Sequence, residues 1–295
     1  MRIGHYQAAC SPGDFDANLA KVEAGLQRAR QEHVDILCYP ECFLTGYFNR
    51  EEPARKAAFA ADDPRMESVL ALTAGYDTTI VAGFNERRGG DLYNTALVAR
   101  RGTLLGLYSK VSAYMNYHKQ GRSFPVFEHE GTVFGVVICS DGGYIEPTRI
   151  LALKGARIVF APHYNVIGKE NLLSHFTRVR RDHMARAVEN RIWFVRGNQV
   201  TFGRDAGLEN DGVGYGDSYI LDPDGEIVVR SRRHVEDFIF CDVHDTAPDT
   251  TWGLGRSRWS AREFGALSLE AARGTRPPAL EQRGQEQTMY PAAKP

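Results

Sequence analysis

The chain has 295 residues, enough for one large domain or two modest ones, and its 43% hydrophobic and 25% charged residues are ordinary for a globular protein. Lys and Arg number 36 against 37 Asp and Glu, so no global charge favours a nucleic-acid partner or an acidic membrane. No apolar run reaches the roughly 18 residues of a membrane span, and the first residues lack the apolar region of a signal peptide. A membrane partner is therefore not expected.

The first half of the chain alternates short strand-like runs with amphipathic segments, a pattern typical of an α/β fold. Between the first two strands, Asp16 is predicted to cap a helix that carries Leu19, Val22, Leu26 and Ala29 on one face. Strands are predicted at Arg2–Ala8, Asp35–Tyr39, Thr79–Asn85, Tyr93–Arg100, Leu104–Ser109 and Val133–Ile138.

The alternation continues in the second half. Helices are predicted at Glu146–Leu153 and Leu172–Glu189, and strands at Arg157–Ala161, Ile192–Asn198, Asp217–Leu221, Glu226–Arg230 and Asp237–Val243. From about Thr275 the chain becomes rich in Pro, Gln and Gly and loses its periodicity. We expect one domain over residues 1–265 and a C-terminal tail over 266–295, which either packs on a neighbouring subunit or frays.

Cysteines are few and odd in number: Cys10, Cys38, Cys42, Cys139 and Cys241. A disulfide scaffold is therefore not expected, and a reducing compartment, the cytoplasm, is predicted. Cys38 and Cys42 have a spacing that could hold a metal, but without a second pair or a His cluster they indicate core packing. The sequence predicts no metal and no organic cofactor.

Three polar side chains, Glu41, Lys110 and Cys139, stand where strand-like runs end. Ligands of open α/β sheets bind outside the carboxyl ends of the strands, so these positions favour function. In one dry pocket, a carboxylate can take the proton of a thiol, and an ammonium can stabilise the thiolate and the oxyanion that forms after attack. Each residue alone also has an ordinary interpretation: a loop acid, a solvated lysine and a small core residue.

Three sequence blocks around these residues, Asp35–Tyr47, Leu107–Val111 and Gly135–Glu146, resemble those of the nitrilase superfamily of carbon–nitrogen hydrolases. The resemblance covers roughly residues 1–245. It implies that Glu41 is the general base, Lys110 a catalytic lysine and Cys139 the nucleophile. It also implies a four-layer α-β-β-α sandwich that dimerises through its helical faces, so a homodimer or higher homo-oligomer is expected.

The turn that carries the cysteine, Cys139–Tyr144, most resembles that of aliphatic amidases and formamidases, and the backbone N–H of Ser140 is expected to help bind the oxyanion. One departure concerns the segment before Gly121. Family members usually carry a second Glu there, and this chain has no acid in the segment. Tyr114 or Asn116 is expected in its place, where either could hydrogen-bond a substrate without acting as an anionic base.

Further pocket residues are expected on the surrounding loops. His163, Tyr164 and Asn165 follow a strand that ends at Pro162, and Tyr47 closes the first block. His183 lies on the apolar face of its helix and is interpreted as a satisfied core histidine.

The sequence thus predicts a thiol hydrolase that cleaves the non-peptide C–N bond of a small amide through a thioester. One alternative keeps the chemistry and changes the substrate to an N-carbamoyl (ureido) amine. Another is a binding or regulatory relative with weak catalysis, because the second Glu is absent. A Cys–His protease using His163 or His183 is a more distant alternative, since it leaves Glu41 and Lys110 without a role.

Overall fold

The computed structural model describes residues 1–244, 265–266, 268–270 and 273. The chain divides into two units, Met1–Gly255 and Arg256–Pro295, and the first unit contains both sheets and the helices that cover them. The predicted tail, 266–295, lies almost entirely outside the described residues, so its boundary stays a prediction.

Twelve of the strands form two six-stranded sheets. The first sheet has the order β14-β1-β2-β3-β4-β5 and consists of β1 (Arg2–Gln7), β2 (Ile36–Cys38), β3 (Thr79–Arg88), β4 (Asp91–Arg100), β5 (Thr103–Ser109) and β14 (Asp237–Asp242). The second has the order β13-β12-β10-β8-β7-β6 and consists of β6 (Val126–His129), β7 (Thr132–Val136), β8 (Ile158–Pro162), β10 (Trp193–Gly197), β12 (Tyr219–Leu221) and β13 (Ile227–Arg230). A separate pair joins β9 (Val166–Ile167) to β11 (Val213–Gly214).

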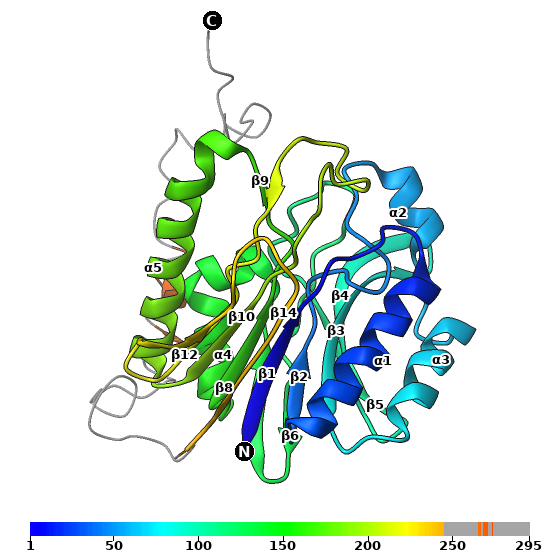
Figure 1. The fold of residues 1–295 in the computed structure, drawn as a ribbon. Helices are drawn as coiled ribbons and strands as arrows, with labels where there is room; N and C mark the ends of the chain where they lie inside the picture. The colour runs from blue at the N-terminus through cyan, green and yellow to red at the C-terminus, as the bar shows by residue number, and fades with distance from the viewer. Residues whose placement is uncertain (245–264, 267, 271–272, 274–295) are drawn as a thin grey trace, which may run out of the picture. The chain divides into compact units, whose positions relative to one another are not determined.

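Helices cover the outer faces of both sheets (Figure 1). They are α1 (Phe15–Gln31), α2 (Glu51–Ala57), α3 (Pro64–Thr73), α4 (Ile145–Leu153) and α5 (Leu172–Asn190), with short 3-10 turns η1 (Cys139–Gly143) and η2 (Lys169–Asn171). Val22 and Leu26 of α1 pack with Ile80 on the first sheet, whereas Leu151 of α4 and Ala187 of α5 pack on the second. This layering confirms the predicted α-β-β-α sandwich.

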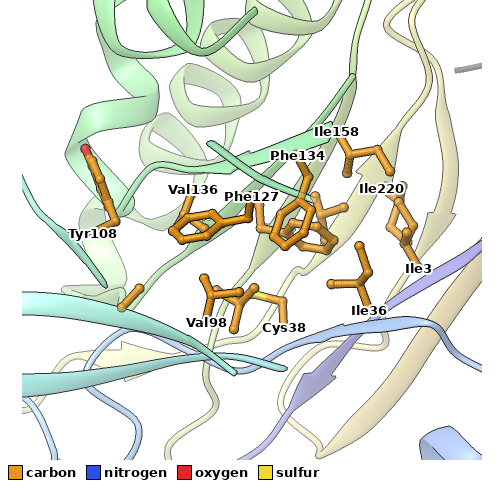
Figure 2. Packing of buried hydrophobic residues seen from close by; sticks show 14 of the residues in the cluster. Ile3, Ile36, Cys38, Val98, Tyr108, Phe127, Phe134, Val136, Ile158 and Ile220 are labelled. Atoms are coloured by element: carbon orange, nitrogen blue, oxygen red, sulfur yellow. The ribbon is translucent and has the colours of Figure 1, made fainter. Parts of the chain in front are cut away.

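The two sheets face each other across a shared apolar core. Figure 2 shows Ile3, Ile36 and Val98 of the first sheet facing Phe134 and Ile158 of the second. All five side chains are fully buried. Strands covered on both faces in this way read as nearly continuous apolar runs, as Val133–Ile138 does in the sequence. Cys38 belongs to the same core, as its apolar-packing interpretation predicted.

The first helix begins two residues earlier than its sequence indicates. Asp14, rather than Asp16, is the N-cap, and its side chain accepts a hydrogen bond from the backbone N–H of Ala17 at 3.0 Å. Asp16 lies in the first turn, where a carboxylate also stabilises a helix through the macrodipole. Two acids two residues apart both fit a helix start, and only the backbone geometry distinguishes them.

The strand directions bring the functional positions to one end of the sandwich. β2 and β3 are parallel, and β4 is antiparallel to both β3 and β5, so β2 and β5 run the same way. In the second sheet β7, β8 and β10 are parallel. The backbone N–H of Glu41, after β2, donates to the carbonyl of His163, after β8, at 3.3 Å. The carboxyl ends of the two sheets therefore meet.

Candidate active site

Glu41 is held by three hydrogen bonds and is 1% exposed. Its Oε1 accepts from Nζ of Lys110 and from Nδ2 of Asn94, each at 2.7 Å, and its Oε2 accepts from the backbone N–H of Tyr164 at 2.9 Å. These donors come from both sheets and fix the orientation of the carboxylate.

The chain that carries Glu41 crosses β3 at a glycine. A methyl group added to Gly83 would lie 2.3 Å from the backbone nitrogen of Cys42 and 2.9 Å from the carbonyl oxygen of Pro40. Only a residue without a side chain permits this approach. Gly83 therefore lets the turn after β2 lie across the sheet with the carboxylate of Glu41 directed at Lys110.

Lys110 follows β5 and is also 1% exposed. Its backbone N–H donates to the carbonyl of Asn94 and its carbonyl accepts from Gly121 N–H, both at 2.8 Å. Burial by itself would lower the pKa of the ammonium. The negative charges of Glu41 and of the Cys139 thiolate, which forms only at high pH, outweigh burial and raise the pKa of Lys110 above its usual value. Lys110 is therefore a permanent cation in the site.

Cys139 begins the turn after β7 with a φ of +49°, in the left-handed region that non-glycine residues rarely adopt. Its Sγ accepts a hydrogen bond from Nδ2 of Asn165 at 3.6 Å, and Oδ1 of Asn165 accepts from Arg196 at 2.7 Å. Arg196 thus orients the amide so that its N–H groups face the sulfur.

The Cys139 thiol has an elevated pKa. Burial and the negative charge of Glu41 raise it to about 11, while Lys110, Asn165 and Arg196 oppose the rise. At neutral pH the sulfur is therefore a protonated thiol in the free protein. An attack by this thiol requires a base.

The turn itself is fixed by Asp141, which is fully buried. Its carboxylate accepts from the hydroxyl of Tyr108 (2.7 Å), from Ser112 N–H (2.7 Å) and from Ile138 N–H (3.1 Å). Ser140 lies in the first turn of η1, where backbone N–H groups have no carbonyl partner within the helix. Its N–H is available to bind an anion, and its hydroxyl donates to the carbonyl of Ser112 at 2.8 Å.

Tyr47, Tyr164 and His163 line the neighbourhood of Glu41. The rings of Tyr47 and Tyr164 stack with centroids 5.5 Å apart, and the Tyr164 hydroxyl donates to Asp205 at 2.9 Å. His163 directs Nδ1 at the carbonyl of Ala161 (2.7 Å), and burial lowers its pKa well below the usual value. His163 therefore has an intramolecular partner on Nδ1 and contributes its backbone carbonyl to the position of Glu41.

The family model for carbon–nitrogen hydrolases matches residues 2–247. The chain belongs to the carbon–nitrogen hydrolase family. It is accordingly a hydrolase that acts on C–N bonds.

Three relatives illustrate the similarity of this hydrolase to known proteins. A probable nitrilase of Schizosaccharomyces pombe is 30% identical over 259 residues, covering 83% of this chain and 90% of the relative. N-carbamoylputrescine amidase of Arabidopsis thaliana is 28% identical over 283 residues, covering 87% and 91%. A solved structure of a cysteine-to-alanine variant of an amidase from Nesterenkonia sp. AN1, in complex with butyramide, is similar in fold, with a TM-score of 0.69, 23% identity and coverage of 82% and 90%.

The structure does not bring Tyr114 or Asn116 into the group around Glu41 in this hydrolase. Tyr114 is 60% exposed and Asn116 is also exposed. The buried side chain of this segment is that of His118, which is 5% exposed. The segment from 111 to 117 is half-buried or exposed throughout, and His118 is the residue of this part of the chain that packs inward.

Sequence reasoning missed three further polar residues of the site. Asn94 and Arg196 interrupt the apolar strands β4 and β10, and a polar residue inside an apolar run is a usable signal of a buried polar network. Asp141 has no comparable signal, since an acid a few residues after a strand is common at a helix start. His183, in contrast, is confirmed as a core residue that pairs Nδ1 with the Tyr219 hydroxyl at 2.8 Å.

Among the described residues, no helix has both the length and the apolar character that crossing a membrane requires. Within the same part of the chain, no three His, Cys, Asp or Glu side chains are arranged to hold a metal ion. Cys42, which shares a metal-like spacing with Cys38 in the sequence, lies instead in an apolar cluster with Tyr47 and Tyr164.

Proposed function

We propose that this carbon–nitrogen hydrolase cleaves a small amide through a thioester on Cys139, with Glu41 as the base and Lys110 as the oxyanion stabiliser. The observation that carries the proposal is the 2.7 Å ion pair between Lys110 and Glu41, in which both side chains are 1% exposed. A buried ion pair contributes little net stability, because desolvation of two charges offsets their attraction. Its presence beside a thiol at the meeting edges of two sheets favours a chemical role.

Acylation begins with removal of the thiol proton, because burial and the charge of Glu41 keep the Cys139 thiol protonated at neutral pH. Glu41 takes the proton of Cys139 as the S–C bond forms at the carbonyl carbon, and the C=O electron pair moves to oxygen. The ammonium of Lys110 and the Ser140 N–H stabilise that oxyanion. When the intermediate collapses, the C–N bond breaks and the proton on Glu41 passes to the leaving nitrogen, which departs as ammonia.

Deacylation repeats the sequence with water. Glu41 removes a proton from a water molecule that attacks the thioester carbonyl, and the second oxyanion faces the same two donors. Its collapse breaks the C–S bond, and the proton returns from Glu41 to the sulfur. A carboxylic acid is released and the thiol is restored, so one water is consumed for each C–N bond broken.

A ureido group is the second candidate substrate. The similarity to N-carbamoylputrescine amidase over 87% of this chain supports it. A ureide presents the same carbonyl carbon and the same terminal N–H₂ to Cys139, so the chemistry is unchanged. The products differ, because loss of ammonia leaves an N-alkylcarbamoyl thioester, and its hydrolysis releases carbon dioxide and an alkylamine instead of a stable carboxylic acid.

The proposal is tested with butyramide, N-butylurea and butyronitrile at matched concentrations. We expect butyramide to yield equal amounts of ammonia and butyrate. Release of carbon dioxide and butylamine from N-butylurea at a higher kcat/KM would favour the ureido candidate. If a panel of amides, ureides and nitriles gave neither product nor a covalent adduct, the binding alternative would be supported and the hydrolytic proposal contradicted.

A further inference from the structure

His118 lies beside the proposed site and is the only buried side chain between residues 111 and 120, a segment that the structure describes in full. Its ring centroid is 4.5 Å from that of Tyr117 and 6.4 Å from that of Tyr47. Tyr47 stacks on Tyr164, whose backbone N–H binds Glu41. The positive charge of Lys110 is also close enough to lower the pKa of His118. The imidazole therefore belongs to the same neighbourhood as the Glu41–Lys110 pair.

The hydrogen bonds of Asn85 determine which nitrogen of His118 carries the proton. Nδ2 of Asn85 donates to the carbonyl of Gly46 at 2.7 Å and lies 2.9 Å from Oγ1 of Thr45. The Gly46 carbonyl can only accept, so turning the amide over would lose that bond and place two acceptors against each other. Oδ1 of Asn85 is consequently an acceptor, and it lies 2.8 Å from Nε2 of His118. Nε2 must therefore carry the hydrogen, and Nδ1 must present a lone pair.

Nδ1 of His118 is buried and has no hydrogen-bond partner among the described residues. Burial, assisted by Lys110, lowers the pKa of His118 to about 3, so the ring stays neutral throughout the working range of a hydrolase. A buried acceptor without a partner carries a desolvation cost that a ligand N–H can remove. The lone pair on Nδ1 is thus suited to receive a donor that the protein itself does not supply.

We propose that Nδ1 of His118 accepts a hydrogen bond from the N–H₂ group of the substrate and so selects amides and ureides over nitriles and esters. This inference rests on the proposed function, because it assigns a partner to the substrate's nitrogen in that site. A nitrile and an ester have no N–H on the reacting group, so they leave Nδ1 unpaired. Discrimination against a substrate that lacks the expected donor is typically stronger than discrimination by size alone.

The test is a cycle that changes the residue and the substrate atom separately. Butyramide and methyl butyrate differ at the group that faces Nδ1, and His118→Leu removes the acceptor. For butyramide, kcat/KM should fall about 10- to 100-fold, the loss expected when a buried hydrogen bond is removed. For methyl butyrate the change should stay within about threefold, since no hydrogen bond is lost. His118→Gln, which can offer an amide oxygen, should recover part of the loss on butyramide.

Tyr114→Phe is the matched control, because Tyr114 lies in the same segment but is 60% exposed. It should leave both substrates unchanged. Equal losses on amide and ester in His118→Leu, or no loss on the amide, would overturn the inference.

A second arm covers the case in which the wild-type protein fails to turn over one of the two substrates. Binding of butyramide is then compared in Cys139→Ala and in Cys139→Ala/His118→Leu by calorimetry. Weaker binding in the double variant supports the inference, and equal binding overturns it. Absence of turnover on both substrates would contradict the proposed function alone, so the two failures are distinguishable.

Discussion

Replacing Cys139 by alanine should lower the rate of butyramide hydrolysis by at least about 10⁴-fold, since loss of a nucleophile removes the covalent route altogether. The fold should persist. Alanine and cysteine both carry a Cβ, so the backbone strain at a φ of +49° is the same for both. The turn is held by hydrogen bonds to the carboxylate of Asp141 and not by the sulfur. Ammonia release and circular dichroism measure the two parts of this expectation.

Cys241→Ala provides the control for loss of a thiol. Cys241 lies on β14, at the edge of the first sheet, and its side chain is partly buried against the core between the sheets. Its alanine variant should hydrolyse butyramide at the wild-type rate. Near-wild-type turnover by Cys139→Ala would show that another group attacks the substrate.

Glu41→Gln and Lys110→Gln should affect hydrolysis in the same direction and thiol ionisation in opposite directions. In the proposed mechanism Glu41 is the base and Lys110 an oxyanion donor, and loss of one oxyanion donor alone typically costs about 100- to 1000-fold in kcat. The charge of Glu41 raises the pKa of the Cys139 thiol and the charge of Lys110 lowers it. Glu41→Gln should therefore move the pKa of the thiol below about 11, and Lys110→Gln should move it above that value.

The pH profile of alkylation by iodoacetamide, followed at the peptide that contains Cys139, measures these shifts. The rate rises with pH as the thiolate forms, so the profile should move to lower pH in Glu41→Gln and to higher pH in Lys110→Gln. Each unit of lowered pKa gives about tenfold more thiolate with only about threefold weaker nucleophilicity, so the net direction is preserved. Shifts in the same direction for both variants would contradict the opposite effects of Glu41 and Lys110 on the pKa of the Cys139 thiol. Thermal unfolding monitors the stability of each variant, because breaking a buried ion pair is itself destabilising.

The helices and strands that were predictable from the sequence are the long ones with a clear hydrophobic period. The strand runs Thr79–Asn85 and Tyr93–Arg100 and the helix Leu172–Glu189 correspond to β3, β4 and α5 with boundaries shifted by a few residues. Short elements were missed. α2 has only seven residues and includes a proline, and β9 and β11 pair over two residues each. None of these three elements is long enough to show a periodic pattern in the sequence.

The positions of Glu41, Lys110 and Cys139 were predictable from the ends of strand-like runs, while their catalytic roles stay a prediction. Glu41, Lys110 and Cys139 each follow a strand, and the parallel arrangement brings those ends together. The burial of His118 was not predictable, because the sequence of a loop does not show which of its side chains faces inward. Which of Tyr114, Asn116 and His118 is buried depends on contacts with Asn85 and Tyr47, which are remote in sequence.

The orienting groups are also long-range features. Arg196 reaches Cys139 through Asn165. Arg196 lies on β10, whereas Asn165 follows β8 and Cys139 follows β7. A charged residue in an apolar strand indicates a buried network, but its partners follow only from the packing of the strands. Sequence patterns therefore predict which polar residues follow the strands better than they predict the residues that hold those side chains in place.

The thioester on Cys139 is the central claim, and rapid acid quenching followed by intact-mass spectrometry tests it most directly. After mixing with butyramide, the wild-type protein should gain the mass of one butyryl group, and peptide mapping should place it on Cys139. Cys139→Ala should gain none. Release of ammonia at the wild-type rate without any adduct on Cys139, or with the adduct on another of the five cysteines, would contradict the account.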